Sequence, residues 1–314
     1  MSEFDLIQRY FTRPAPGAAL GVGDDAALLA VGAGKELAVS SDMLVCGTHF
    51  LPDADPFLLG HKTLAVNLSD LAAMGAVPRW ATLSLALPQV DEPWLQRFSD
   101  GFFALADAHG VELVGGDTTR GPLNLCVTIM GEVPAGRALR RDGAQPDDDI
   151  WVSGTLGQAA LGLAFMQGKH MFYDQVREDC LQALHQPQPR VALGLALRGI
   201  ARSAIDISDG LLADLGHILQ RSGVGAELEI AALPLVETGV ETEFAQRCAL
   251  AGGDDYELCF SAPATARDTL AALAEQLKLR LTRIGKIKAG AGCVVHDAAG
   301  KEMKIEKAGY DHFA

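Results

Sequence analysis

Hydrophobic residues in the first half of the chain follow two different spacings. Leu64, Leu68 and Leu71 recur three or four positions apart, which is the spacing of one helix face. The Asp-Pro pair at 55–56 supplies an N-cap and a proline at the first helical position, and Gly75 is typical of a helix end. A helix is therefore predicted between these two signals.

A second helix is predicted between Pro93 and Gly110, where Trp94, Phe98 and Phe102 recur at helical spacing. Shorter apolar or alternating runs before and after the two helices are typical of strands. Strands are predicted at 37–41, 80–87, 111–114 and 125–133. The first half of the chain thus alternates between strands and helices.

The composition turns polar and rich in turn residues at 143–149, and we interpret this stretch as a domain boundary. Beyond it, helices are predicted at 157–167, 175–184, 190–197, 211–219 and 265–277. Strands are predicted at 150–153, 204–207, 256–260, 281–287, 293–296 and 303–306. This order predicts two domains, 1–145 and 146–314, of mixed α/β and α+β character.

The charge and the cysteines limit the possible partners and location. The 314 residues carry a net charge of −14 with scattered basic residues, which argues against binding to nucleic acid or an anionic membrane surface. The six cysteines form no C-x-x-C pair and favour free thiols in a reducing compartment. The stretch 1–13 lacks the plan of a signal peptide, and no uncharged apolar stretch could span a bilayer. We therefore expect a cytoplasmic protein.

Aspartates repeatedly follow short apolar or glycine-rich runs. Glycines directly precede the acidic groups at 24–25, 117 and 254–255, and glycine lets the backbone approach a bound group closely. Asp70 shares a helix face with Asn67, away from the leucines. These residues either fill turns and helix caps, or converge on a ligand. The whole set comprises Asp24, Asp25, Asp42, Asp70, Asp117, Asp206, Asp209, Asp254 and Asp255.

A convergent set of carboxylates requires cations, because like charges a few ångströms apart repel by about 1 to 4 kcal/mol per pair. Mg²⁺ combines one or two carboxylates with waters and phosphate oxygens, whereas zinc prefers Cys and His. The pattern therefore predicts several Mg²⁺ ions and a polyphosphate. The chain has no G-x-x-x-x-G-K-[ST] loop and no protein-kinase motif set, so an ATP site here belongs to neither common class.

Five segments together resemble the thiamine-monophosphate kinase family. They are 21–27 (GVGDDAA), 62–78 (KTLAVNLSDLAAMGAVP), 115–121 (GGDTTRG), 205–210 (IDISDG) and 252–258 (GGDDYEL), and the similarity reaches the closing segment 309–313. The family lies in the superfamily of aminoimidazole ribonucleotide synthetase and selenophosphate synthetase. The resemblance implies an N-terminal α+β domain whose sheet joins that of a second subunit in a dimeric barrel. It also implies a C-terminal α/β domain, with ATP and the metals between the two domains.

The resemblance also implies roles for individual residues. Asp42, Asp70 and Asp117 are expected to be catalytic, and Arg120 is a further candidate phosphate contact. The implied metal ligands are Asp25, Ser40, Ser41, Asp42, Asp70, Asp117, Asp206 and Asp209. The implied ATP contacts are Gly116, Asp117, Arg141 and Ser208, and the implied thiamine-phosphate contacts are His49, Glu257 and Tyr310.

The implied activity is transfer of the γ-phosphate of ATP to thiamine monophosphate, giving thiamine diphosphate, by a Mg²⁺-dependent homodimer. The acceptor phosphate has a second pKa of about 6 and is largely ionised near neutral pH, so we expect direct in-line transfer without a general base. Two alternatives stay open. One is a related ATP-using synthetase of the same superfamily, and the other is a non-catalytic metal-binding scaffold or maturation partner.

Two positions depart from the family pattern. The segment 146–149 reads Pro-Asp-Asp-Asp where the family usually has Pro-Gly-Asp, and Asp254 stands where the family often has Gly or Glu. Neither change affects an implied ligand, so both are expected to alter local loop shape only.

Overall fold

The computed structural model describes residues 2–171, 174–236, 241–305, 308–310 and 312–313. The chain divides into two compact units. The N-terminal unit comprises Met1–Leu71 and Ala76–Gly136, and the C-terminal unit comprises Ala72–Gly75 and Arg137–Ala314. The change from the N-terminal to the C-terminal unit after Gly136 lies before position 145, where the sequence predicts the domain boundary.

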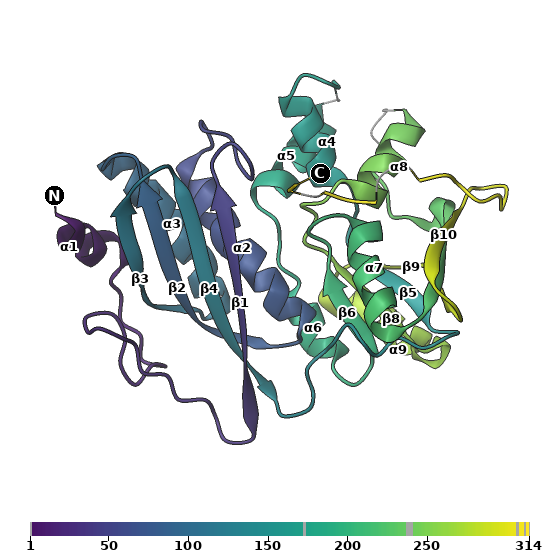
Figure 1. The fold of residues 1–314 in the computed structure, drawn as a ribbon, viewed down its shortest axis with the longest axis horizontal. Coiled ribbons are helices and arrows are strands. Elements are labelled where there is room, and N and C mark those ends of the chain that lie inside the picture. Colours follow the sequence, from purple (N-terminus) through teal and green to yellow (C-terminus); the bar gives the residue numbers. More distant parts are fainter. Residues whose placement is uncertain (1, 172–173, 237–240, 306–307, 311, 314) are drawn as a thin grey trace. The chain divides into compact units, whose positions relative to one another are not determined.

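The N-terminal unit is built on a four-stranded sheet in the order β1-β4-β2-β3 (Figure 1). The strands are β1 (Lys35–Val45), β2 (Val77–Leu87), β3 (Glu112–Arg120) and β4 (Asn124–Pro134). The β2–β3 pair is parallel, and the other two pairs are antiparallel. Helices α2 (Pro56–Ala73) and α3 (Glu92–His109) lie against one face of the sheet, as Figure 1 shows.

The predicted end of α3 at Gly110 is confirmed by its backbone geometry, and its N-cap is Asp91. The Asp91 side chain caps α3 by accepting a hydrogen bond from the Trp94 N–H, and Gly110 ends the helix with a left-handed φ of 64°. Gly60 of α2 and Gly101 of α3 bring the two helix backbones into close contact. An added Cβ would lie 2.1 Å from the Phe98 carbonyl oxygen at Gly60, and 1.9 Å from the Phe57 carbonyl oxygen at Gly101.

The prediction that a strand ends at position 114 is wrong, because β3 continues to Arg120. The glycine pair at 115–116, which suggests a turn in the sequence, stays in parallel register with β2. Gly116 reaches this pairing with a φ of 148°, and an added Cβ would lie 1.9 Å from the Leu83 carbonyl oxygen. Asp117 therefore lies within a strand and not after one.

The two faces of β1 differ in burial. Leu44 is buried on the side of the helices, whereas large apolar side chains that alternate with it are exposed. These exposed side chains belong to Leu37, Val39 and Met43.

The C-terminal unit contains a six-stranded sheet in the order β10-β7-β9-β5-β8-β6. Its strands are β5 (Asp149–Ser153), β6 (Ser203–Asp206), β7 (Gly225–Glu229), β8 (Leu258–Ala262), β9 (Leu281–Lys288) and β10 (Gly292–His296). The β10–β7 pair is parallel and the other pairs are antiparallel. The helices are α4 (Gln158–Met166), α5 (Asp174–His185), α6 (Val191–Leu197), α7 (Leu211–Ser222), α8 (Thr242–Ala251) and α9 (Arg267–Leu277).

One expected strand is absent, and several elements were not expected. Met303–Ile305 form no strand, and a single bridge joins His296 to Glu302, while position 306 lies outside the described residues. Strand β7, helix α8, and the N-terminal helix α1 (Glu3–Leu6) with the π-helix Ile7–Phe11 have no counterpart in the sequence prediction. Within the described part of the chain, no helix is both long and apolar enough to cross a membrane.

Candidate active site

Ser40, Asp42 and Asp70 come together where β1 packs on α2. The Ser40 hydroxyl donates a 2.5 Å hydrogen bond to Asp70 Oδ2, and the Asp42 N–H donates to Asn67 Oδ1 at 3.1 Å. Two-residue alternation directs Ser40 and Asp42 to the same sheet face. Three-residue spacing on α2 turns Asn67 and Asp70 toward them, which confirms that these two residues share a helix face.

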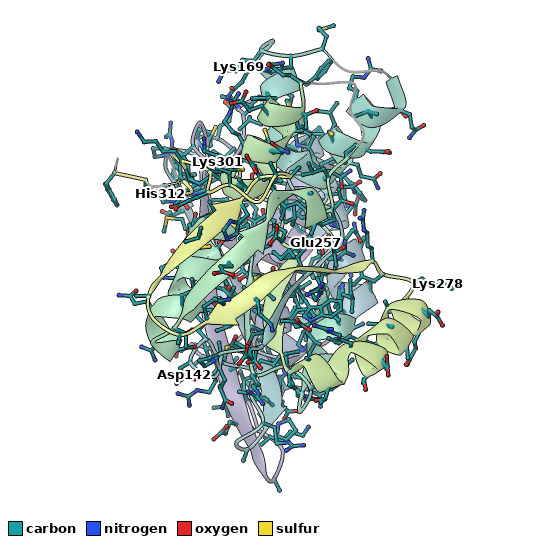
Figure 2. All side chains as sticks on the ribbon, turned by 90° about the vertical axis from the view of Figure 1, so that its right-hand side faces the viewer. Asp142, Lys169, Glu257, Lys278, Lys301 and His312 are labelled. Carbon is teal, nitrogen blue, oxygen red and sulfur yellow. The ribbon has the colours of Figure 1, made fainter. Side chains whose placement is uncertain are left out.

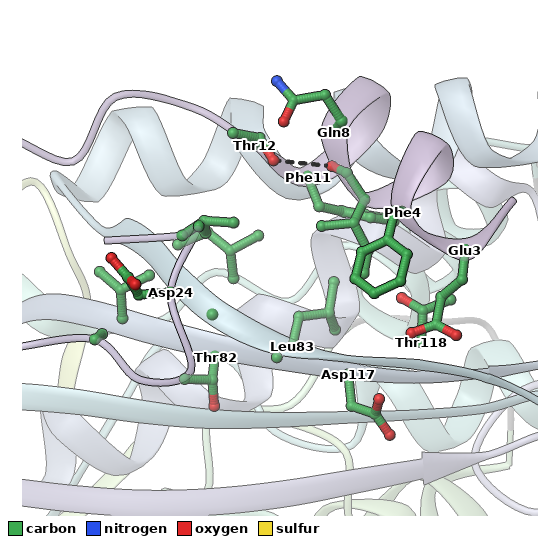
Figure 3. A pocket seen from close by; sticks show the side chains of 18 of the residues that line it. Glu3, Phe4, Gln8, Phe11, Thr12, Asp24, Thr82, Leu83, Asp117 and Thr118 are labelled. Carbon is green, nitrogen blue, oxygen red and sulfur yellow. Dashed lines mark hydrogen bonds between the residues drawn. The ribbon is translucent and has the colours of Figure 1, made fainter. Parts of the chain in front are cut away.

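A second acidic group lines a cavity of about 880 Å³ within the N-terminal unit. Asp24 and Asp25 come from the glycine-rich loop, and Gly116 and Asp117 come from β3. Figure 3 shows Asp24 and Asp117 among the residues that line this cavity, together with Thr82 and Leu83 of β2. The cavity is within the size range of small-molecule and cofactor sites.

The strand register separates these two acidic groups within one chain. Asp42 pairs with Val127, Val127 with Leu83, and Leu83 with Gly116, so Asp42 and Gly116 stand at opposite ends of one row across four strands. Three strand spacings of about 4.8 Å place the ends of this row roughly 14 Å apart. Asp117 is one position beyond the row and faces the opposite side of the sheet from Asp42.

Ser41 lies on the same sheet face as the exposed side chains of β1, not beside Asp70. Its hydroxyl donates to the Val127 carbonyl oxygen at 3.0 Å and is 3.0 Å from Thr128 Oγ1. Ser40 and Ser41, which are neighbours in the sequence, therefore belong to different faces of the sheet.

Three predicted segments meet in the C-terminal unit through backbone hydrogen bonds. The Ile207 N–H donates to the Glu257 carbonyl oxygen at 2.8 Å, and the Asp254 N–H donates to the Ser208 carbonyl oxygen at 2.8 Å. The Tyr310 N–H donates to the Asp209 carbonyl oxygen at 2.9 Å. The structure thus brings together the predicted residues Asp206, Ser208, Asp209, Glu257 and Tyr310.

Asp214 shapes the first of these loops, and the sequence reasoning missed it. Its Oδ2 accepts hydrogen bonds from the N–H groups of Ser208, Asp209 and Gly210 at 3.0, 3.0 and 3.1 Å. Burial raises the pKa of Asp214 to about 6, against the opposing effect of these N–H groups. The available signal was an Asp in the first turn of α7, four positions after the glycine at its start.

Glu257 is a buried carboxylate with fixed partners. It is 5 % exposed and lies among the strands of the C-terminal unit (Figure 2). Its Oε2 accepts hydrogen bonds from Ser153 Oγ at 2.5 Å and from Arg190 Nε at 2.7 Å, and Arg190 also bonds its Oε1. Glu257 and Arg190 line a cavity of about 240 Å³, together with Asp255 and Gln158. Burial raises the pKa of Asp255 well above its ordinary value, although it accepts hydrogen bonds from the Gly157 N–H.

The remaining predicted residues have simpler surroundings. His49 Nδ1 accepts a hydrogen bond from the Val45 N–H at 2.9 Å, so this imidazole closes the turn after β1. Arg141 lines a cavity of about 370 Å³ with His217 and Arg221. Arg120 is the exposed last residue of β3.

The oxygen donors fit magnesium better than a transition metal. In the part of the chain that the structure describes, no three His, Cys, Asp or Glu side chains form a ready metal cage. The Ser40–Asp70 and Asp25–Asp117 groups instead offer one or two carboxylates each. This donor set suits Mg²⁺, which completes its shell with waters and phosphate oxygens.

Comparisons with known proteins agree along the whole chain. Residues 23–133 match the family model of the AIR synthase related protein, N-terminal domain, and residues 145–298 match that of the C-terminal domain. Thiamine-monophosphate kinase of Salmonella typhimurium is 49 % identical over 319 residues, covering 99 % of this chain and 98 % of that protein.

Solved structures give the same result. The crystal structure of thiamine-monophosphate kinase from Stenotrophomonas maltophilia is 52 % identical, with a TM-score of 0.85 and 96 % of both chains covered. AaThiL, solved in complex with AMPPCP and TMP, is 31 % identical with a TM-score of 0.77, covering 99 % of this chain and 96 % of that one. The chain therefore belongs to the thiamine-monophosphate kinase family, among the proteins related to AIR synthase.

Proposed function

We propose that this chain transfers the γ-phosphoryl group of ATP to the phosphate of thiamine monophosphate by direct in-line displacement, giving thiamine diphosphate. The observation that carries the proposal is the set of oxygen donors, above all the bonded pair Ser40 and Asp70, and Asp25 and Asp117, which line one cavity. These occur in a chain that matches relatives of this activity over 99 % of its length. Such donors suit a substrate that arrives as a metal–polyphosphate complex.

All of the proposed metal ligands are oxygen atoms. Bound magnesium would supply the positive charge that offsets the repulsion between the two phosphate groups. Asp42 and Asp70 are the proposed central residues, because α2 and β1 hold them in one fixed cluster. The full proposed set is Asp25, Ser40, Ser41, Asp42, Asp70, Asp117, Asp206 and Asp209.

The residues of the chain position the reactants and take no proton. The acceptor phosphate is already largely ionised near neutral pH because its second pKa is about 6. Gly116, Asp117, Arg141 and Ser208 are proposed to hold ATP, with the Ser208 backbone fixed by Asp214. His49, Glu257 and Tyr310 are proposed to contact thiamine monophosphate.

We also propose that the active form is a homodimer joined through the N-terminal sheet. Leu37, Val39 and Met43 form an exposed apolar row on the sheet face that carries no helix. A second copy across this face would bury the two apolar rows against each other.

The test incubates the protein with MgATP and, in parallel, thiamine monophosphate, thiamine or formylglycinamidine ribonucleotide. ADP and thiamine diphosphate should form with thiamine monophosphate only. ADP formation with the ribonucleotide alone would support the related synthetase, and metal binding without any ADP would support the scaffold. Sedimentation of the same sample should give a dimer.

A matched variant tests the proposed metal role. Asp42→Asn removes the negative charge that is proposed to bind Mg²⁺ at this position. Turnover should therefore fall at least 100-fold at limiting Mg²⁺, with the temperature of thermal unfolding unchanged. Asp100→Asn, on the exposed side of α3, is the control and should keep wild-type turnover. Near-wild-type activity of Asp42→Asn at limiting Mg²⁺ would refute the assigned role.

A further inference from the structure

The N-terminal helical segment forms one wall of the 880 Å³ cavity. Glu3, Phe4 and Ile7 line it from this side, opposite the glycine-rich loop and strands β2 and β3. The segment turns from α1 into a π-helix at Ile7–Phe11, and the Thr12 hydroxyl donates to the Ile7 carbonyl oxygen at 3.1 Å. Short π-helical turns occur frequently at functional sites, because they alter the direction of the side chains that follow.

This segment is anchored on the N-terminal unit. Leu6, Tyr10 and Phe11 are buried, and each is at most 5 % exposed. A capping box between Ser2 and Asp5 closes the helix start. Arg9 of the segment also bonds a carboxylate oxygen of α3 at 2.8 Å. The wall therefore has a defined position beside the cavity.

Phe4 departs from this pattern of burial. It is 79 % exposed, whereas Leu6, Tyr10 and Phe11 of the same segment are buried. Figure 3 shows its ring directed into the space between the helix and the strand residues Leu83 and Asp117. An exposed aromatic ring at the rim of a polar cavity is typical of a ligand-binding surface.

The cavity is lined by acidic and by apolar side chains. Asp24, Asp25 and Asp117 are among the acidic ones, and Phe4, Ile7 and Val22 are among the apolar ones. A nucleotide needs both kinds of surface, because it combines a metal-bound polyphosphate with a flat aromatic base. Stacking on an aromatic side chain needs no particular base edge, because every base has a π-face.

We propose that Phe4 stacks on the base of the nucleotide whose phosphates bind at Gly116 and Asp117. This inference rests on the proposed function, because it assigns the base end of the same ATP site. Phe4 is a binding residue and takes no part in the transfer itself. Its effect should therefore appear in the affinity for nucleotide and not in the rate at saturation.

Initial rates of Phe4→Ala, Phe4→Trp and wild type test the proposal, with ATP varied at saturating thiamine monophosphate. Phe4→Ala should raise the KM for ATP about tenfold, with kcat and the KM for thiamine monophosphate within twofold, and Phe4→Trp should restore the affinity. Magnesium tripolyphosphate, which has no base, should inhibit wild type and Phe4→Ala with the same Ki. Met171→Ala, which removes an apolar side chain that is 82 % exposed, is the control and should match wild type.

Two outcomes overturn the inference while leaving the proposed function intact. An unchanged KM for ATP in Phe4→Ala would show that the base binds elsewhere. A change in sedimentation without a change in that KM would show that Phe4 packs against a second copy. If wild type forms no thiamine diphosphate, the proposed function itself fails. Adenosine binding by calorimetry, lost in Phe4→Ala and kept in wild type, would then still support the base site.

Discussion

The Ser40 hydroxyl and the Asp70 carboxylate are joined by a 2.5 Å hydrogen bond across 30 positions of sequence. The bond links the centre of β1 to the last turns of α2, and it takes up one oxygen of a carboxylate that we propose as a metal ligand. The orientation of Asp70 therefore depends on a residue of another element.

Removal of this hydroxyl should weaken metal binding without abolishing it. Ser40→Ala should raise the Mg²⁺ concentration for half-maximal rate about tenfold or more, because partners that orient a ligand typically contribute 10- to 100-fold. Asp70→Asn should abolish turnover at every Mg²⁺ concentration. Rates measured over a Mg²⁺ titration check this prediction, and equal half-maximal concentrations in Ser40→Ala and wild type would contradict it.

Glu257 should control the affinity for thiamine monophosphate. Its ion pair with Arg190 should stabilise the folded protein. Glu257→Gln should raise the KM for thiamine monophosphate about tenfold and leave that for ATP within twofold. Arg190→Ala should lower the free energy of unfolding by about 3 to 5 kcal/mol, since it leaves a buried carboxylate without its ion pair.

The double variant Arg190→Met with Glu257→Gln separates the two effects. It removes both charges, so much of the unfolding free energy should return while the KM for thiamine monophosphate stays high. Urea unfolding and initial-rate kinetics measure the two quantities. If both KM values rise equally in Glu257→Gln, the carboxylate has no selective role at the acceptor.

Glu132 should make the N-terminal unit sensitive to acid. The Lys35 ammonium, the Gly32 N–H and Arg79 hold the pKa of this buried carboxyl at about 2, below its ordinary value of 4.5. Because the folded pKa is the lower one, the stabilisation is complete above pH 4.5 and is lost as the pH falls toward 2.

The expected loss is about 2 kcal/mol, which is less than the pKa difference alone gives, since Lys35 and Arg79 are partly exposed. Glu132→Gln should be less stable than wild type at pH 7, and the difference should shrink between pH 4.5 and 2. Urea unfolding at a series of pH values checks this. A difference that stays constant across that window would contradict the assignment.

Asp147 should be a site where glycine stabilises the protein. It has a left-handed φ of 74°, at the position where the family usually has glycine. Its ion pair with Lys286 is 3.5 Å long and 89 % exposed on the Asp147 side, so it contributes little. Asp147→Gly should raise the free energy of unfolding by about 0.5 to 1 kcal/mol. Asp147→Ala is the control and should be less stable than wild type, because alanine lacks the flexibility of glycine and adopts a left-handed φ less readily than aspartate.

The sequence predicted those elements whose ends carry their own chemical signals. Pro93 and Gly110 indicate α3 without reference to any other part of the chain, and the structure confirms the proline in the first turn and Gly110 at the end. The predicted strand ends at position 114 because Gly115 and Gly116 suggest a turn. Only their pairing with β2 shows that they continue β3. The sequence pattern does not predict helix α8, because many of its apolar residues are alanines and give only a weak helical pattern.

The same distinction holds for the candidate site. Asn67 and Asp70 could be placed on one helix face from their spacing alone. The separation of Asp42 from Asp117 follows from strand order and register, which the local pattern does not contain. The departure at Asp254 has a related explanation, because its φ of 62° is again a left-handed conformation that glycine adopts freely.

The close approach of α2 to α3 at Gly60 and Gly101 has a consequence for the position of Asp70. The separation of α2 from α3 is set there by peptide groups that touch directly, and no side chain fills the gap. A methyl group at either glycine would push α2 and α3 apart. Asp70 lies on α2, ten positions after Gly60, so it would be displaced with the helix. A hydrogen bond of 2.5 Å tolerates little displacement. The geometry of the proposed metal site thus depends partly on the absence of side chains at Gly60 and Gly101, where the two helices cross.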